Sequence, residues 1–204
     1  MNYFLVLKKY FILLMMLGSV NLFANDNGKF LIFGHTGFTK DFAPPYFSSY
    51  WERGLNMGLG LGLRLSENVV LQGSAEYHLF KKTKDVITNG DGSVYSLLLN
   101  LKKSAPGKTK SSFMPYYKAG AGLLQLNTVA VFSSTGNEYS RESAIKLEEG
   151  EKHRSVFSAA AGMGIDTIIN DDTMLFMEVS VVLGFDRNEI ITIVPLKLGV
   201  SVEL

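Results

Sequence analysis

The chain has 204 residues, of which 47% are hydrophobic, with 20 Lys and Arg against 19 Asp and Glu. This length suits one domain with a full-sized core. The near balance of charge leaves no excess of cations to face a phosphate backbone, so nucleic acid is not expected as a partner. The chain has no cysteine, which excludes disulfides, thiolate chemistry and a lipid anchor on cysteine.

The first 24 residues have the composition of a secretory signal peptide. Two lysines precede an apolar run over 10–17, and a more polar stretch leads to Ala24. This order predicts export and cleavage after Ala24, and the run is too short to span a bilayer comfortably. Cleavage leaves a domain of residues 25–204 with 18 basic and 19 acidic residues, a net charge of −1.

The segment GLNMGLGLGLRL, residues 54–65, alternates large apolar residues with glycine, asparagine and arginine. Each glycine would destabilise a helix by about 1 kcal/mol relative to alanine, whereas a strand would place every leucine on one face. Eight such strand-like segments are separated by turn-like clusters, and only in the first is the facing of the residues ambiguous. They cover residues 29–38, 51–65, 69–80, 93–102, 113–126, 155–168, 173–185 and 189–204.

The second face of these strands indicates what surrounds them. It carries glycine, alanine, serine and isolated charges, whereas a soluble sandwich would present long polar side chains to water. Small residues suit a crowded polar interior, so the leucine-rich face is expected to contact lipid. No later segment has the 18 uncharged apolar residues of a transmembrane helix. The sequence therefore predicts an all-β fold, an eight-stranded antiparallel up-and-down transmembrane barrel.

The connections between the segments differ in length. They are short over 66–68, 103–112, 169–172 and 186–188, and long over 39–50, 81–92 and 127–154. Short periplasmic turns and long extracellular loops are typical of outer-membrane barrels, and 186–188 is the exception here. We expect a location in the bacterial outer membrane with both termini in the periplasm. Phe113, Tyr116 and Tyr117 are expected to belong to an aromatic girdle at the membrane interface.

The chain resembles the small eight-stranded outer-membrane barrels of the OmpA/OmpX and opacity-protein type. The resemblance rests on the signal peptide, the eight strands, PYYKAGAGL at 115–123 and the closing VPLKLGVSVEL at 194–204. It extends over nearly the whole mature chain. It implies a barrel without a cofactor, surrounded by outer-membrane lipids and lipopolysaccharide and inserted by the barrel-assembly machinery.

Four charged residues fall on inward positions, and counting along the strands puts all of them near mid-membrane: Glu76, Lys118, Glu178 and Lys197. Buried charges are strongly destabilising unless they are paired. We therefore expect a salt-bridge network in the lumen, with Glu178 and Lys197 as neighbours on adjacent strands. The network would hold the barrel together or, in a second interpretation, gate a narrow ion-conducting pore. His78 is expected to point into the same lumen.

A second group of polar residues, Glu151, His153 and Ser155, would share one face where a strand leaves the membrane. An acid, an imidazole and a hydroxyl are the components of a lipid-modifying esterase similar to a lipid A deacylase. They are more typical of a solvated rim. His35, His78 and His153 lack metal-ligand spacing, and no nucleotide-binding motif is complete, so neither a metal nor a cofactor is expected.

The expected function is therefore that of a non-enzymatic outer-membrane barrel that supports envelope integrity or binds at the cell surface through its loops. The polar and charged loop 127–154 is the main candidate for a surface ligand, because long loops often carry function. The alternatives are the lipid-modifying enzyme and the narrow pore.

Overall fold

The computed structural model describes residues 29–43, 51–82, 87–88, 92–105, 113–127, 131–132, 154–186 and 189–204. Within these ranges, eight strands of 13 to 16 residues build the barrel. They are β1 (Phe30–Ala43), β2 (Trp51–Ser66), β3 (Val69–Lys82), β5 (Gly92–Ser104), β6 (Phe113–Asn127), β8 (Arg154–Ile168), β9 (Thr173–Phe185) and β10 (Ile190–Glu203). Two short strands, β4 (Ile87–Thr88) and β7 (Val131–Phe132), complete the described elements.

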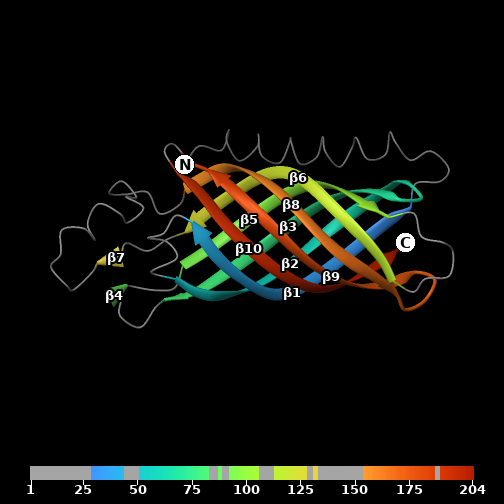
Figure 1. Cartoon of the computed structure of the whole chain (residues 1–204), viewed down its shortest axis with the longest axis horizontal. Helices are drawn as coiled ribbons and strands as arrows, with labels where there is room; N and C mark the ends of the chain where they lie inside the picture. The colour runs from blue at the N-terminus through green and yellow to red at the C-terminus, as the bar shows by residue number, and fades with distance from the viewer. Residues whose placement is uncertain are drawn as a thin grey trace, which may run out of the picture.

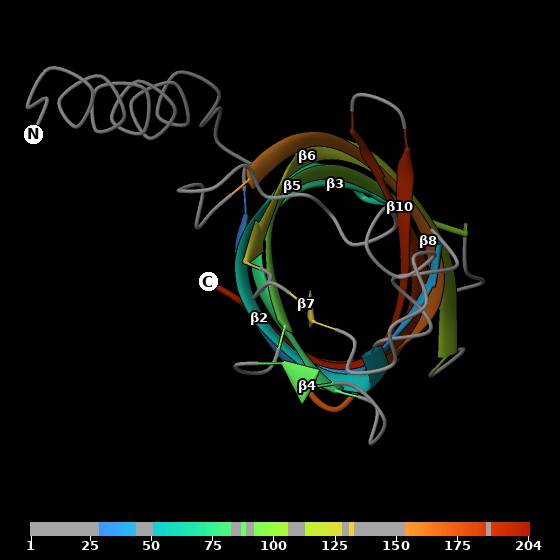
Figure 2. The same cartoon turned by 90° about the vertical axis from the view of Figure 1, so that its left-hand side faces the viewer.

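The eight long strands of the described chain form one closed ring, seen end-on in Figure 2. Each pairs antiparallel with the next one along the sequence, and β10 pairs with β1 from Leu31 opposite Glu203 to Ala43 opposite Thr192. Closure removes the free edges that an open sheet would expose. The predicted eight-stranded antiparallel up-and-down barrel is confirmed.

The outer surface of the barrel is apolar over its whole circumference. Leu59, Leu97 and Met163 are 71%, 60% and 66% exposed, and every strand carries further exposed apolar residues. An apolar surface of this extent matches the hydrocarbon region of a bilayer. Among the described residues, no helix is long and apolar enough to cross a membrane.

The glycines of β2 leave room for side chains that reach across from neighbouring strands. A Cβ atom on Gly60 would lie 2.2 Å from the ring of Phe33, and one on Gly58 would lie 2.5 Å from the imidazole of His35. Both contacts are too short for real atoms. The alternation of leucine and glycine in β2 therefore serves two environments, because the leucines cover the outside and the glycines accommodate rings on the inside.

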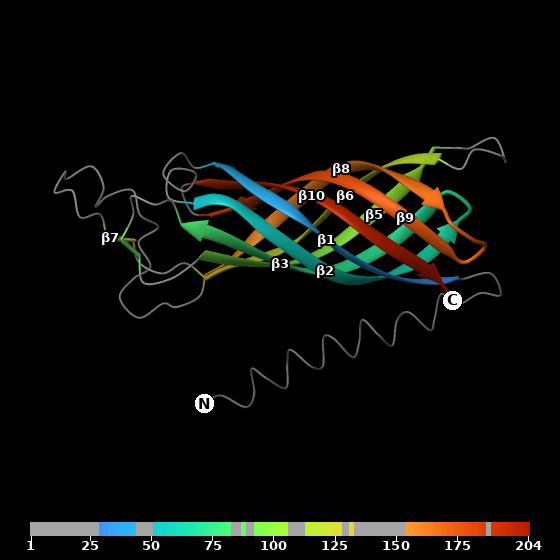
Figure 3. The ribbon, with the colours of Figure 1, turned by 90° about the horizontal axis from the view of Figure 1, so that it is seen from below.

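The two ends of the barrel differ. The short-turn end carries the turn at 67–68, the turn at 169–172 and the C-terminus, whereas β4 and β7 pair with each other beyond the opposite, long-loop end (Figures 1 and 3). Both short strands fall in segments that the sequence analysis assigned to loops.

The first strand is longer than predicted, and its facing is now defined. Instead of ending at residue 38, β1 continues to Ala43, because Lys40 and Asp41 still pair with β10. Phe33 points inward, where it packs with Phe176, while Ile32 is exposed on the outside. The sequence left this facing ambiguous because both faces of the strand carry apolar residues.

The lumen near the long-loop end is apolar, in contrast to the polar interior expected from the sequence. Ten buried side chains form a cluster that we call the apolar plug. Its members are Phe80, Val94, Leu98, Leu124, Leu126, Val156, Ala160, Val182, Ile191 and Ile193. Phe80, Leu124 and Ile193 have no exposed surface at all. The three consecutive leucines at 97–99 indicate an apolar lumen in the sequence, because an apolar run without alternation is typical of a strand that is apolar on both faces.

Because Leu59 faces outward, the free energy of unfolding of the barrel should depend strongly on the polarity of the side chain at this position. Leu59→Arg should lower the free energy of unfolding in lipid vesicles by about 2–4 kcal/mol, because it places a cation in hydrocarbon. Ile169→Arg, in an exposed turn, is the control and should change it by no more than about 1 kcal/mol. Denaturant titration followed by the fluorescence of the single tryptophan measures both. Equal effects of the two substitutions would contradict a lipid-facing Leu59.

Candidate functional site

The four charged residues predicted to form a network all point into the lumen. Glu76 on β3, Lys118 on β6, Glu178 on β9 and Lys197 on β10 are each less than 10% exposed. Strand alternation determines this facing, since the residues on either side of each one are on the outer surface or partly exposed. Lys197 and Glu178 lie directly opposite each other on adjacent strands.

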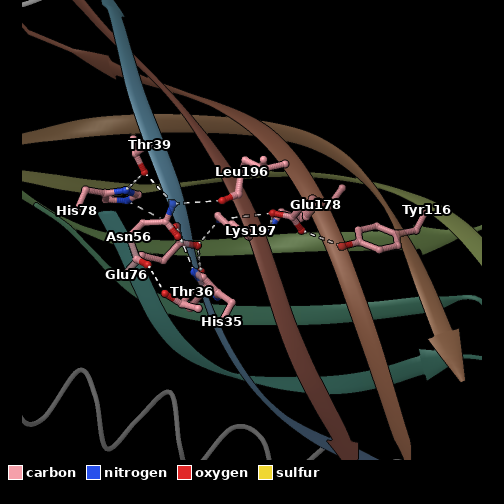
Figure 4. Close-up of polar contacts among 12 residues, drawn as sticks. His35, Thr36, Thr39, Asn56, Glu76, His78, Tyr116, Glu178, Leu196 and Lys197 are labelled. Atoms are coloured by element: carbon pink, nitrogen blue, oxygen red, sulfur yellow. Dashed lines mark hydrogen bonds and ion pairs between the residues drawn. The ribbon is translucent and has the colours of Figure 1, made fainter. Parts of the chain in front are cut away.

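Lys197 is the centre of the network (Figure 4). Its Nζ lies 2.7 Å from Oε1 of Glu76 and 3.4 Å from Oε1 of Glu178, and Nζ of Lys118 lies 2.8 Å from the same oxygen of Glu178. β10 and β3 are not hydrogen-bonded neighbours, because β1 and β2 lie between them in the ring. The ion pair between Lys197 and Glu76 therefore spans the lumen and connects separate parts of the wall.

A second buried ion pair lies closer to the short-turn end. Nζ of Lys102 is 2.7 Å from Oδ2 of Asp166, and it also lies 3.8 Å from the centre of the Tyr116 ring. The hydroxyl of Tyr116 donates a hydrogen bond of 3.1 Å to Oε2 of Glu178, which connects this pair to the main network. The alternation in the sequence placed Lys102 and Asp166 on the inner face, but the predicted network did not include them.

Tyr116 itself was assigned to the wrong surroundings. The sequence analysis placed it in an aromatic girdle with Phe113 and Tyr117, which are indeed 63% and 57% exposed, but Tyr116 is only 4% exposed. The period of two would have given the correct facing, because Tyr116 and Lys118 are two residues apart and share the inner face.

On the other side of Glu76, two histidines and two neutral polar residues extend the network toward the long-loop end. Oε2 of Glu76 lies 3.6 Å from Nε2 of His78 and 4.0 Å from Nε2 of His35. Asn56 donates to Oγ1 of Thr39 at 2.9 Å, and Oγ1 lies 2.9 Å from Nδ1 of His78. The Thr39 hydroxyl has one donor and two acceptor lone pairs, so after accepting from Asn56 it is able to pair with Nδ1 in either neutral tautomer of His78.

Thr39, His78 and Glu76 therefore form a sequence of hydroxyl, imidazole and carboxylate. In an open cleft this order would suit a nucleophile and its base. Here the side chains are buried, and Thr39 is 1% exposed, so the site offers no entry for a substrate ester. The arrangement is that of an internal brace.

A cavity of about 70 Å³ opens at the short-turn end and reaches the network. This volume has room for about five water molecules. Its lining includes Arg64, Lys102, Lys118, Glu178 and Lys197. The described lumen thus contains a polar cavity at one end, the ion-pair network in the middle and the apolar plug at the other end.

Ion pairs at the two rims tie neighbouring strands together. Glu203 near the end of β10 pairs with both Arg64 of β2 and Lys29, so it joins β10 to β2 across β1 at the seam of the barrel. At the long-loop end, Arg154 of β8 pairs with Asp186, which follows β9. These exposed and partly exposed pairs add modestly to stability.

The architecture matches known structures, although no protein family and no curated protein matches the sequence. Neisserial surface protein A superposes with a TM-score of 0.64 at 13% identity, over 86% of this chain and 97% of that one. OprG from Pseudomonas aeruginosa gives a TM-score of 0.56 at 15% identity, over 87% and 96% of the two chains. The N-terminal β-barrel domain of OprF from the same species gives 0.50 at 14% identity, over 87% and 100%.

This chain has the fold of the small eight-stranded outer-membrane β-barrels. The resemblance predicted from the sequence is thereby confirmed at the level of the fold. Identities of 13% to 15% show the fold alone. The chemistry of an eight-stranded outer-membrane barrel must therefore be argued from its own residues.

The polar group proposed at the strand exit is only partly visible in this barrel. Ser155 lies on β8, opposite Gln125, and its side chain is exposed on the outer surface. Glu151 and His153 lie outside the described residues, so their grouping with Ser155 stays a prediction. Residues 1–24, the predicted signal peptide, and most of the loop 127–154 also lie outside them. Within the described ranges, no group of three or more His, Asp or Glu side chains is suited to hold a metal ion.

The central place of Lys197 predicts that its removal destabilises the barrel severely. Lys197→Met leaves Glu76 without its ammonium partner and should lower the free energy of unfolding by about 3–5 kcal/mol. Adding Glu76→Gln should recover most of this loss, since Glu178 keeps Lys118. Denaturant titration in lipid vesicles measures the free energy of unfolding of both variants. The exposed Lys103→Met is the control and should stay within about 0.5 kcal/mol. An unchanged midpoint for Lys197→Met would show that the ion pair contributes nothing to the fold.

Proposed function

We propose that the chain is a non-enzymatic barrel of the bacterial outer membrane that supports envelope integrity or makes surface contacts through its loops. It acts through its wall and loops, and its lumen serves to hold the wall together. The observation that carries this proposal is the filled lumen, with the apolar plug at the long-loop end and the ion-pair network behind it. A filled lumen provides neither a route across the membrane nor a substrate pocket open to the outside.

We also propose the location of the chain and its orientation in the membrane. The apolar outer surface supports a position in a bilayer, and OprG, a solved structure with this fold, is an outer-membrane protein of a bacterium. Short turns at the end that carries the C-terminus favour a periplasmic position for that end, with the long loops outside the cell. A cleaved signal peptide at 1–24 accounts for export, and insertion then requires the barrel-assembly machinery.

The two alternatives have less support. A narrow pore needs a continuous aqueous path, and the described lumen is blocked by Phe80, Leu124 and Ile193 in the plug. A lipid-modifying enzyme needs Glu151, His153 and Ser155 together, and only the exposed Ser155 is described. The loop 127–154 remains the proposed site for a surface ligand.

The proposal is tested in cells that lack the chain and are complemented with two variants. Glu76→Gln combined with Lys197→Met removes the ion pair that crosses the lumen and leaves the pair of Lys118 and Glu178 in place. This variant should restore envelope resistance and surface attachment to the level of the unaltered chain. Replacing residues 133–150 by a short Gly/Ser linker should leave the barrel in the outer-membrane fraction and abolish attachment. Heat-modifiable migration in electrophoresis reports whether each variant is folded.

Two results would contradict the proposal. A folded lumen variant that fails to complement would show that the lumen carries the function. A change of one acyl chain in the lipid A mass spectrum, dependent on the chain and abolished by Ser155→Ala, would make the protein an enzyme.

A further inference from the structure

Three cations lie side by side on the outer wall at the long-loop end. Thr39 of β1 lies opposite Gly54 of β2, and Gly54 lies opposite Phe80 of β3. The next residue toward the long-loop end is a cation on each of the three strands, and all three side chains are exposed. They are Lys40, Arg53 and Lys81, which we call the basic patch.

These cations face away from the lumen. Thr39 and Phe80 are buried on the inner side, so strand alternation turns Lys40 and Lys81 outward. Arg53 lies where the register of β2 against β3 shifts, between Trp51 and Gly54, and its side chain is exposed. Neighbouring strands are about 4.8 Å apart, so the three positions extend over roughly 10 Å of the wall.

None of the three residues of the basic patch forms an ion pair with a carboxylate in the part of the chain that the structure describes. Asp41, which follows Lys40, interacts with it electrostatically but is itself buried. Nζ of Lys40 also lies 5.2 Å from the centre of the Phe42 ring. Three neighbouring like charges repel one another, so an external anion would stabilise them.

The basic patch also lies at the border of the apolar surface. Two residues below Lys40 and Arg53 along their strands are Phe38 and Leu55, which are 60% and 49% exposed on the same outer face. The wall therefore presents apolar side chains at the depth of acyl chains and cations directly above them. This order matches an anionic lipid whose charged group lies at the membrane surface.

On the rest of the circumference, Arg154 of β8 is a cation at the long-loop end, but it is paired with Asp186. On the other five strands, the described outward residues nearest the long-loop end are uncharged: Ser93, Asn127, Ser155, Phe185 and Ile190. A general preference for the membrane surface would distribute cations around the ring. Among the described residues of this end, exposed cations without an ion pair to a described carboxylate lie on β1, β2 and β3, which indicates a site for a discrete partner.

We propose that the basic patch binds the phosphates of lipid A, the acylated and phosphorylated disaccharide of lipopolysaccharide. Lys40, Arg53 and Lys81 contact the phosphates, and the acyl chains lie against Phe38 and Leu55. The proposal rests on the outer-membrane location and orientation proposed above, which place this end of the barrel in the leaflet that contains lipopolysaccharide. A phosphorylated disaccharide fits better than a phospholipid, because its charges are distributed over a width comparable to that of three strands.

The test measures binding of bisphosphorylated lipid A to the full chain, purified from membranes and placed in phosphatidylcholine nanodiscs. The variant Lys40→Gln, Arg53→Gln, Lys81→Gln should bind at least about tenfold more weakly, because three charge-assisted contacts are lost. The charge-conserving variant Lys40→Arg, Lys81→Arg should bind as the unaltered chain does. Added salt should weaken the binding of the unaltered chain, since exposed charges are screened.

The control removes two exposed lysines at the short-turn end of the barrel, Lys29→Gln and Lys103→Gln. It should change the affinity less than about twofold, because Lys29 and Lys40 are separated by most of the length of β1, which is more than a Debye length. Dephosphorylated lipid A and phosphatidylglycerol should both bind more weakly than bisphosphorylated lipid A to the unaltered chain. Equal affinity of the patch variant and the control, or equal binding of phosphatidylglycerol, would overturn the assignment.

The lipid A binding test and the test of the proposed function have outcomes that can be told apart. Binding in nanodiscs does not depend on where the chain is found in the cell, whereas cell fractionation tests the location directly. A chain in the outer membrane whose patch variant binds lipid A unchanged would refute the lipid site alone. A chain found in another membrane would refute the location, and with it the assignment of lipid A as the natural partner.

Discussion

The buried ammonium of Lys197 is the constraint on which the interior of this barrel depends. A cation that is 2% exposed must be compensated, and Glu76 and Glu178 supply that compensation from two sides. The pair with Glu76 reaches across the lumen and joins strands that share no backbone hydrogen bonds. The wall is therefore held both by its continuous ladder of strand pairs and by contacts through its centre.

The interior of the barrel is divided into three zones along the barrel axis. The ion-pair network occupies the middle, the apolar plug fills the long-loop end, and the polar cavity opens at the short-turn end. Such a lumen is blind, since water entering from one end meets a packed apolar cluster before the other. Function is therefore expected at the outer wall and the loops. There the barrel contacts lipid and, in the proposed orientation, the surroundings of the cell.

Much of the fold could be predicted from the sequence, because the alternation in 54–65 separates a lipid face from an inner face without reference to other strands. Alternation also placed the charged residues inward. It failed where both faces are apolar, as at Leu98 in the plug and at Phe33, whose ring occupies the space beside Gly60. Which inward groups meet across the lumen depends on strand register and barrel closure. For that reason the hydrogen bond from Tyr116 to Glu178 could not be derived from the sequence.

The blind lumen is tested most directly with single cysteines, because the chain contains none of its own. Gln72 lines the cavity at the short-turn end, whereas Ser158 is fully buried beside Val156 and Ala160 of the plug. With the folded barrel in nanodiscs, so that both ends are in contact with the solution, the rate of reaction with a small charged thiol reagent is measured. A lumen closed by the apolar plug predicts rapid labelling of Gln72→Cys and labelling of Ser158→Cys only after unfolding. Equal rates for the two cysteines in the folded barrel would show that the lumen is open throughout and would contradict the account.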